Sequence, residues 1–332
     1  MLFPLGVAIG AGIAAALLFS VTIKGTALAM ALAYLSPLPI MIAALGWGLQ
    51  ADLIAVVISG SVVAGVLDPV SGLIYAVTVA LPSGLLAGLA VLDRANPFDP
   101  ASPPARPFRA GAGALAAVAA GLGFAVSAGA IGVMIILNGG YDKAIVAFRQ
   151  LLQPTLDDAM GSPVGLPEGL SVEDVGQLII KFAPAAIAAS TALMLLINLY
   201  VAGRTTQLSD RLSRGWLDLP STFKLPAWLG LLTLAADVAW YLSPEPFNPF
   251  AAALGAPLSL IFLAQGLAAL HALSRRAPGR WAVMVALYLA VFLAPRWVGP
   301  ALVAFGLAES ALKLRMRNAA RPPKLPHPDP KA

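Results

Sequence analysis

Long stretches without charge are the feature that most limits what this chain can fold into. The run from Gly111 to Leu137 contains no charged residue, and the run from Leu178 to Val201 contains only Lys181. An apolar stretch of roughly 18 or more residues is long enough to cross a bilayer as a helix. Only 11% of the chain is charged, whereas a soluble globular domain carries about a quarter. We therefore expect an all-α, polytopic transmembrane helical bundle.

About ten hydrophobic segments can be distinguished, and we expect about eight to ten of them to span the membrane. Ser36-Pro37-Leu38-Pro39 interrupts the second segment, and Asp68-Pro69 separates the third from the fourth. Irregular backbone of this kind is tolerated only where it is buried in protein or lines a cavity. The segments cover residues 4–23, 26–46, 52–67, 70–92, 111–137, 178–202, 226–243, 248–273, 281–295 and 298–314.

The connecting sequences suggest four regions: N-terminal transmembrane segments (1–92), a Pro-rich cytoplasmic linker (93–110), C-terminal transmembrane segments (111–315) and a disordered basic tail (316–332). The longest loop, 138–177, is acidic. Apolar residues at helical spacing predict an amphipathic helix in this loop at the outer surface. Ser171, followed by Asp174 three residues later, is placed as the N-cap of the next helix.

Charge is distributed unevenly between the loops. Basic residues gather in 93–110, 203–225, 274–280 and the tail, whereas 138–177 is mainly acidic. Positively charged loops stay on the cytoplasmic side. This alternation predicts a multi-pass protein of the bacterial inner membrane with both termini in the cytoplasm. Because the basic residues occupy positions that set topology, we expect no nucleic-acid partner.

Several kinds of chemistry lack the residues they need. The chain has no cysteine and only two histidines, His271 and His327, so we expect no metal and no cofactor. It contains no G-x-x-x-x-G-K-[ST], H-E-x-x-H or G-x-S-x-G motif. We therefore do not expect an enzyme, and energy for any transport would come from a partner.

Polar residues inside the apolar segments are candidates for ligand binding, because ionisable groups in a membrane are costly. Asp237, with Trp240 and Tyr241 on the same helix face, predicts a pocket wall that faces the outer side. Asn198 and Gln265 are expected behind this wall. Alternatively, Asp237 bonds to a neighbouring helix at the interface, and the two amides bridge helices.

Other charged residues have simpler interpretations. Glu309 and Lys313 are spaced for an ion pair along a helix, and Asp52 and Asp68 are expected to mark the ends of the third segment.

Small residues recur every fourth position in two segments. Ala8, Gly12 and Ala16 form one such face in the first segment, and Gly121, Ala125 and Gly129 belong to another in the fifth. Small faces let helices approach closely in lipid. The face of the first segment predicts either packing within the chain or docking of a separate membrane subunit.

The C-terminal half carries "IFLAQGLAALHALSRR", then "ALYLAVFLAP" and "GPALVAFGLAESALKLRMR", and the N-terminal half carries "AYLSPLPIMIAALGWG". This pattern resembles the YybS-like DUF2232 family of multi-pass membrane proteins. The resemblance implies distant similarity to S subunits of energy-coupling-factor transporters, hence an S-subunit-like core that docks a transmembrane coupling subunit. Such a protein would bind or transport a small solute or lipid-like molecule. The alternative is a non-transporting scaffold of the MreD type that works with envelope-assembly proteins.

Overall fold

The computed structural model describes residues 2–91, 111–160, 171–212, 219–276 and 279–319. Within these ranges all regular structure is helical, which confirms the all-α prediction. The linker expected at 93–110 lies outside the described residues. The elements are α1 (Leu2–Ser20), η1 (Val21–Lys24), α2 (Ala27–Tyr34), α3 (Pro37–Trp47), α4 (Leu49–Val66), α5 (Pro69–Tyr75), η2 (Ala76–Ala80, a π-helical turn), α6 (Leu81–Val91), α7 (Ala112–Asn138), α8 (Tyr141–Met160), α9 (Val172–Leu208), α10 (Leu219–Thr222), α11 (Ala227–Leu242), α12 (Asn248–Leu273), η3 (Ser274–Arg276), α13 (Arg280–Leu293), α14 (Pro295–Leu312) and α15 (Leu314–Ala319).

Seven stretches of the described chain are long and apolar enough to cross a membrane. Two shorter apolar helices, α11 and α13, add to them. A polytopic helical bundle is therefore confirmed, and each of the ten expected segments corresponds to helical structure. The seven stretches are Pro4–Lys24, Ala27–Trp47, Leu49–Val66, Pro69–Val91, Ala112–Asn138, Val172–Leu208 and Asn248–Leu273.

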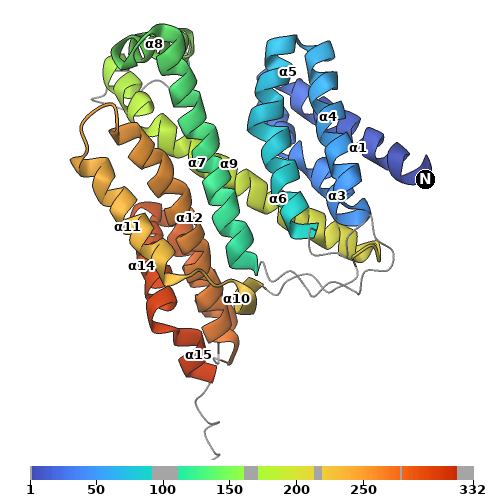
Figure 1. Cartoon of the computed structure of the whole chain (residues 1–332). Helices are drawn as coiled ribbons and strands as arrows, with labels where there is room; N and C mark the ends of the chain where they lie inside the picture. The colour runs from blue at the N-terminus through green and yellow to red at the C-terminus, as the bar shows by residue number, and fades with distance from the viewer. Residues whose placement is uncertain (1, 92–110, 161–170, 213–218, 277–278, 320–332) are drawn as a thin grey trace, which may run out of the picture.

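The helices form two lobes, one from α1 to α6 and one from α7 to α15, and α9 reaches across both (Figure 1). In the N-terminal lobe α1 packs on α4 and α3, and in the C-terminal lobe α12 contacts α7, α9, α11 and α14. The lobes meet where α3 and α6 contact α9 and α7. Residues of all four helices form one shared core there: Met41, Ala44, Leu45, Leu86, Ala87, Val91, Leu115, Ala119, Leu195, Leu199 and Ala202.

The predicted break in the second segment is present between α2 and α3. Pro37 begins α3, and the Ser36 hydroxyl donates to the Ala15 carbonyl at 3.0 Å. The same hydroxyl lies 3.0 Å from the phenol oxygen of Tyr75, and both side chains are fully buried. Ser36 and Pro37 at the break are therefore buried in protein, where a membrane tolerates irregular backbone.

The amphipathic helix predicted in the loop 138–177 is present in its described part. Residues 141–160 form the helix α8, whose polar and apolar residues lie on opposite sides. The Ser171 hydroxyl accepts a hydrogen bond from the Asp174 amide at 3.2 Å, and the Asp174 carboxylate accepts one from the Ser171 amide at 3.0 Å. This reciprocal capping box begins the 37-residue helix α9.

One end of the bundle carries the basic loops 203–225 and 274–280, which follow α9 and α12, and the other carries the mainly acidic loop 138–177 between α7 and α9. At one end, called the basic end, the Arg211 guanidinium lies over the Trp47 ring, 5.1 Å from its centroid. At the other, called the acidic end, Arg149 of α8 pairs with Glu173 of α9 at 3.1 Å. The contact between Trp47 and Arg211 joins the end of α3 to the segment after α9, so both chain segments reach the same end of the bundle.

The C-terminus holds a buried ion pair that differs from the expected one. Glu309 pairs with Arg315 at 2.7 Å, rather than with Lys313. Lys313 adopts φ 53° and ends α14, which turns the chain so that Arg315 reaches back. Arg315 also donates to the carbonyls of Pro220 (2.8 Å) and Phe223 (2.7 Å). These bonds hold α15 in place, so the disordered tail expected from residue 316 does not begin there; residues 320–332 lie outside the described residues.

Helices α12 and α14 approach so closely that only glycine fits at their contact. A Cβ at Gly266 would overlap the Leu302 carbonyl, and one at Gly306 would overlap the Phe262 carbonyl. Gly299, also in α14, has open space at the same position.

We expect Gly306→Ala to lower the free energy of unfolding by about 1–3 kcal/mol, because the added methyl group forces the backbones apart. Thermal or denaturant unfolding in detergent, followed by tryptophan fluorescence, measures this loss. Gly299→Ala is the matched control, since it makes the same change in the same helix without the overlap. Equal stability of the two variants would contradict the close approach.

Asp68 predicts a pH dependence of stability. Its carboxylate caps α5, accepting hydrogen bonds from the Ser71 hydroxyl, the Ser71 amide (3.0 Å) and the Val70 amide (2.9 Å). These bonds, led by that of the Ser71 hydroxyl, hold the pKa of Asp68 below its usual value. The folded state therefore gains stability above the unfolded pKa of about 4, and loses it as the pH falls through the lowered pKa.

We expect Asp68→Ala to destabilise the protein near neutral pH, and the difference from the wild type to shrink in acid. Unfolding midpoints measured between about pH 7 and pH 3 test this expectation. Asp68→Asn keeps an N-cap without a titrating charge, so its effect should not vary with pH. A wild-type advantage over Asp68→Ala that persists in acid would show that the carboxylate charge is not involved.

Candidate functional site

Asp237 faces the neighbouring helix rather than an open pocket. Its half-buried carboxylate accepts a hydrogen bond from the Ser259 hydroxyl of α12 at 3.2 Å. Gly255 lies against the same carboxylate, so closely that a Cβ there would overlap it. These contacts match the alternative in which Asp237 bonds to a neighbouring helix, while a role in ligand binding stays a prediction.

Trp240 and Tyr241 belong to an aromatic cluster at the acidic end. The Trp240 ring is 5.0 Å from the Tyr241 ring and packs edge-on against Phe182 of α9 at 5.6 Å, measured between centroids. The indole N–H of Trp240 is buried without a hydrogen-bond partner, and Tyr241 is 78% exposed. Of the three predicted wall residues, Trp240 and Tyr241 are thus brought together, whereas Asp237 points to α12.

Asn198 connects the lobes. Its amide donates to the Tyr34 carbonyl and to the Met194 carbonyl, both at 2.8 Å. The Tyr34 hydroxyl in turn donates to the Ser190 carbonyl at 2.6 Å. The break between α2 and α3 is therefore bound to α9 by two hydrogen bonds. The side-chain oxygen of Asn198 is buried and has no partner.

Gln265 bridges three parts of the C-terminal lobe. Its side-chain oxygen accepts from the Leu225 amide at 2.5 Å, and its nitrogen donates to the Gly306 carbonyl at 2.8 Å and the Ser310 hydroxyl at 2.6 Å. All its polar atoms are used, which fits the helix-bridging alternative. Asn198 and Gln265 lie in different parts of the bundle, and neither contacts the aromatic cluster in these hydrogen bonds.

The small-residue face of α1 is covered within the chain. Ala8 and Ala16 are fully buried, and Gly12 lies against Ala55 and Ile58 of α4. A separate subunit could reach this face only if α4 moved away. The second small-residue face, in contrast, lies on the surface of the bundle: Gly121, Ala125 and Gly129 of α7 are exposed.

Asp52 lies in the first turn of α4, at the segment end where it was expected, but the structure also buries it. It is 1% exposed, and its carboxyl group lies beside Gly84 and Gly88 of α6. One carboxyl oxygen has no hydrogen-bond partner. The Gly84-x-x-x-Gly88 spacing could have indicated this notch, but the sequence does not show which side chain fills it.

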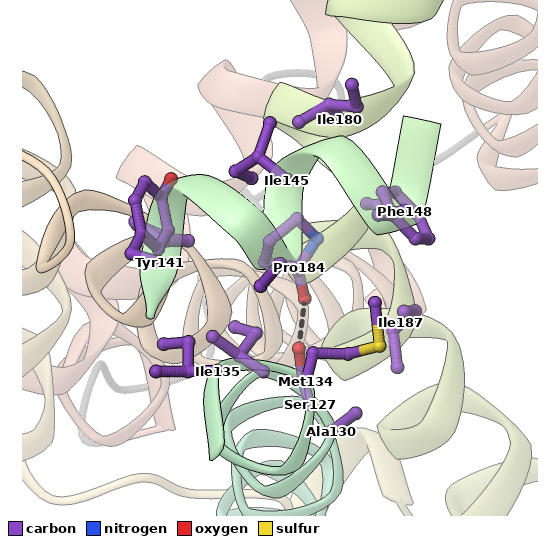
Figure 2. A pocket seen from close by; sticks show the side chains of 14 residues that line it. Ser127, Ala130, Met134, Ile135, Tyr141, Ile145, Phe148, Ile180, Pro184 and Ile187 are labelled. Carbon is purple, nitrogen blue, oxygen red and sulfur yellow. Dashed lines mark hydrogen bonds between the residues drawn. The ribbon is translucent and has the colours of Figure 1, made fainter. Parts of the chain in front are cut away.

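An apolar cavity of about 120 Å³ opens at the acidic end of the C-terminal lobe. The amphipathic helix α8 covers it, while α7, α9 and the start of α12 form its other walls (Figure 2). A void of this size accommodates a ring or a short hydrocarbon segment. Its walls are Ser127, Ala130, Ile131, Met134, Ile135, Tyr141, Ala144, Ile145, Phe148, Ile180, Ala183, Pro184, Ile187 and Pro249.

Few polar groups face this cavity. The Ser127 hydroxyl donates to the Pro184 carbonyl at 2.8 Å (Figure 2) and is thus occupied. Pro184 lies inside α9 and has no N–H, so the Ile180 carbonyl lacks its usual donor four residues on. Both residues line the cavity. A proline inside a long apolar segment was the sequence signal that could have indicated this site.

Tyr141 adds one hydroxyl at the cavity wall. Burial, and then the carboxylates of Glu245 and Asp142, raise the pKa of Tyr141. The phenol therefore stays protonated at neutral pH and can donate a hydrogen bond. Apart from these groups the lining is hydrocarbon. Within the described part of the chain, no cluster of three or more His, Cys, Asp or Glu side chains could hold a metal ion.

The comparisons with known proteins agree with this architecture. A family model described as "predicted membrane protein (DUF2232)" matches residues 13–309. No curated protein and no solved structure matches the chain. Because the family model covers most of the sequence, the chain belongs to the DUF2232 family of predicted membrane proteins.

Proposed function

We propose that this protein is a multi-pass component of the bacterial inner membrane that binds a lipid-like molecule in the apolar cavity under α8. The observation that carries the proposal is the cavity itself, whose 14 lining residues include no charged side chain. Binding pockets for apolar ligands combine such walls with a few polar groups that fix orientation.

The polar groups suit a ligand with a hydrocarbon body and a hydroxyl or amide end. The Tyr141 phenol supplies a donor, and the Ile180 carbonyl supplies an acceptor that the helix leaves unused because of Pro184. A charged group would find no counter-ion among the lining residues. This composition favours an acyl or isoprenoid chain over a charged small solute.

The positive-inside rule places the basic end, and both termini, in the cytoplasm. The cavity then faces the outer leaflet. In this proposal the protein receives its ligand from that leaflet as a non-catalytic binding component with an S-subunit-like core. A separate membrane subunit would supply the energy for any transport.

The exposed face of α7 favours a second candidate, a scaffold of the MreD type in envelope assembly. Gly121 and Gly129 have open space at the Cβ position, and Ala125 between them is exposed. In a bilayer such a face lets another helix dock closely. Helix α7 contributes residues to both the cavity wall and this face, and the two sets of residues lie within one or two helical turns of each other.

Two substitutions on α7 separate the candidates. Ala130 lines the cavity and is exposed, so Ala130→Phe adds bulk at the mouth without opening the core. Ala125→Phe makes the same change on the small-residue face. The probe is hexadecanol with a diazirine in its chain, added to protein in lipid vesicles and crosslinked by light.

We expect crosslinks to concentrate on the cavity walls, and Ala130→Phe to reduce them by about fivefold, which corresponds to about 1 kcal/mol of lost binding. Mass spectrometry of the labelled peptides gives the measurement, and Ala125→Phe should label like the wild type. Labelling spread evenly over all lipid-facing helices and unchanged by Ala130→Phe would sink the binding proposal. Loss of a co-purifying membrane protein in Ala125→Phe alone would support the scaffold.

A further inference from the structure

A second cavity lies at the basic end of the same lobe. It measures about 620 Å³, within the range of small-molecule binding sites. Helices α9, α12 and α13 and the segment around α10 enclose it, so it is separate from the cavity under α8. It is lined by Tyr200, Arg204, Leu219, Pro220, Phe223, Ala264, Leu267, Ala268, His271 and Tyr288.

The lining changes from polar to apolar with depth. Arg204 lies four residues before the end of α9 and His271 two residues before the end of α12, at the level of the basic loops. Ala264 is seven residues before His271, which is about 10 Å farther into the bilayer at the helical rise per residue. A polar rim above an apolar floor suits a phospholipid, which has a polar headgroup and apolar acyl chains.

The rim carries hydrogen-bond donors suited to an anion. The Arg204 guanidinium is exposed and donates to the Gln207 side chain at 3.1 Å, which uses one of its five N–H groups. The His271 Nδ1 lies 2.9 Å from the Leu267 carbonyl, which can only accept, so Nδ1 carries the hydrogen. In the neutral ring Nε2 then accepts from the Tyr288 hydroxyl, 3.3 Å away.

The charges of the lining have one sign. No aspartate or glutamate is among the ten lining residues, and Arg204 contributes a permanent positive charge. Tyr200 lies one helical turn before Arg204 on α9 and adds a hydroxyl. An arginine beside a tyrosine hydroxyl recognises a phosphate group well, because its guanidinium offers two parallel donors. Basic pockets between transmembrane helices at the cytoplasmic side are suited to anionic lipid headgroups.

We propose that this groove binds an anionic phospholipid, with its phosphate at Arg204 and Tyr200 and an acyl chain along Ala264, Ala268 and Phe223. The apolar floor is what favours a lipid over a soluble phosphate, since a soluble anion would leave that surface empty. The inference does not depend on the cavity under α8, and either site can be tested while the other is intact.

The test is native mass spectrometry of the full chain released from detergent micelles. The added probes are phosphatidylglycerol and phosphatidylcholine with identical chains. We expect phosphatidylglycerol to bind in preference, and Arg204→Gln to weaken its binding by about tenfold, as loss of a charge-assisted hydrogen bond implies. Arg296→Gln is the matched control, because Arg296 is exposed at the opposite end, over the Trp297 ring.

A second variant keeps the charge and removes one donor. Tyr200→Phe should weaken phosphatidylglycerol binding by about fivefold, because a neutral hydrogen bond contributes less. Equal binding of both lipids, or equal binding by Arg204→Gln and Arg296→Gln, would overturn the proposal. Displacement of the lipid by glycerol 3-phosphate at equal concentration would also overturn it, since the site would then recognise a soluble anion. Thermal unfolding of each variant shows that it is folded.

Discussion

The constraint on which this structure depends is that the membrane interior offers no water to backbone groups that a helix leaves unpaired. The break before Pro37 removes the helical partner of the Tyr34 carbonyl, because the Leu38 amide bonds to Leu35 instead. Asn198 of α9 supplies the missing donor. The polar side chain that joins the lobes is thus also the group that makes the broken helix tolerable.

This arrangement gives α9 its central place. The helix forms part of both cavities, with Ile180 and Ile187 near its acidic end and Tyr200 and Arg204 near its basic end. Ile187 and Tyr200 are 13 residues apart, which is about 20 Å along the helix axis. The two cavities therefore lie toward opposite leaflets on one continuous helix, whose position is fixed by the hydrogen bonds of Asn198 and Tyr34.

Hydropathy predicted the helices well, because every span must be an apolar segment long enough to cross the bilayer, and hydropathy measures that property. The α2–α3 break and the capping box at Ser171 were also predicted, because each depends only on residues that are close together in the sequence. Pairings across the fold could not be obtained in this way. Glu309 was expected to pair with Lys313 along a continuous helix, but the positive φ at Lys313 ends α14 and directs Arg315 to the carboxylate.

The candidate site shows the same limit. Spacing placed Asp237, Trp240 and Tyr241 on one face, but a helix has neighbours on several sides, and Asp237 packs on α12 while Trp240 packs on α9. Asp52 lies in the first turn of α4, as expected, but its burial was not predicted, because its notch is built by Gly84 and Gly88 more than 30 residues later. Burial by a distant segment leaves no local mark on the sequence.

The two small-residue faces have the same sequence pattern, but different surroundings decide what each face can bind. The face of α1 with Gly12 is filled by α4, whereas the face of α7 with Gly121 and Gly129 remains open. On α7 this open face adjoins Ala130, which lines the apolar cavity. A helix docked on α7 would therefore lie beside the mouth of the cavity. Ligand binding and partner docking then concern adjacent faces of one helix, so a partner seated there would alter access to the cavity through direct contact.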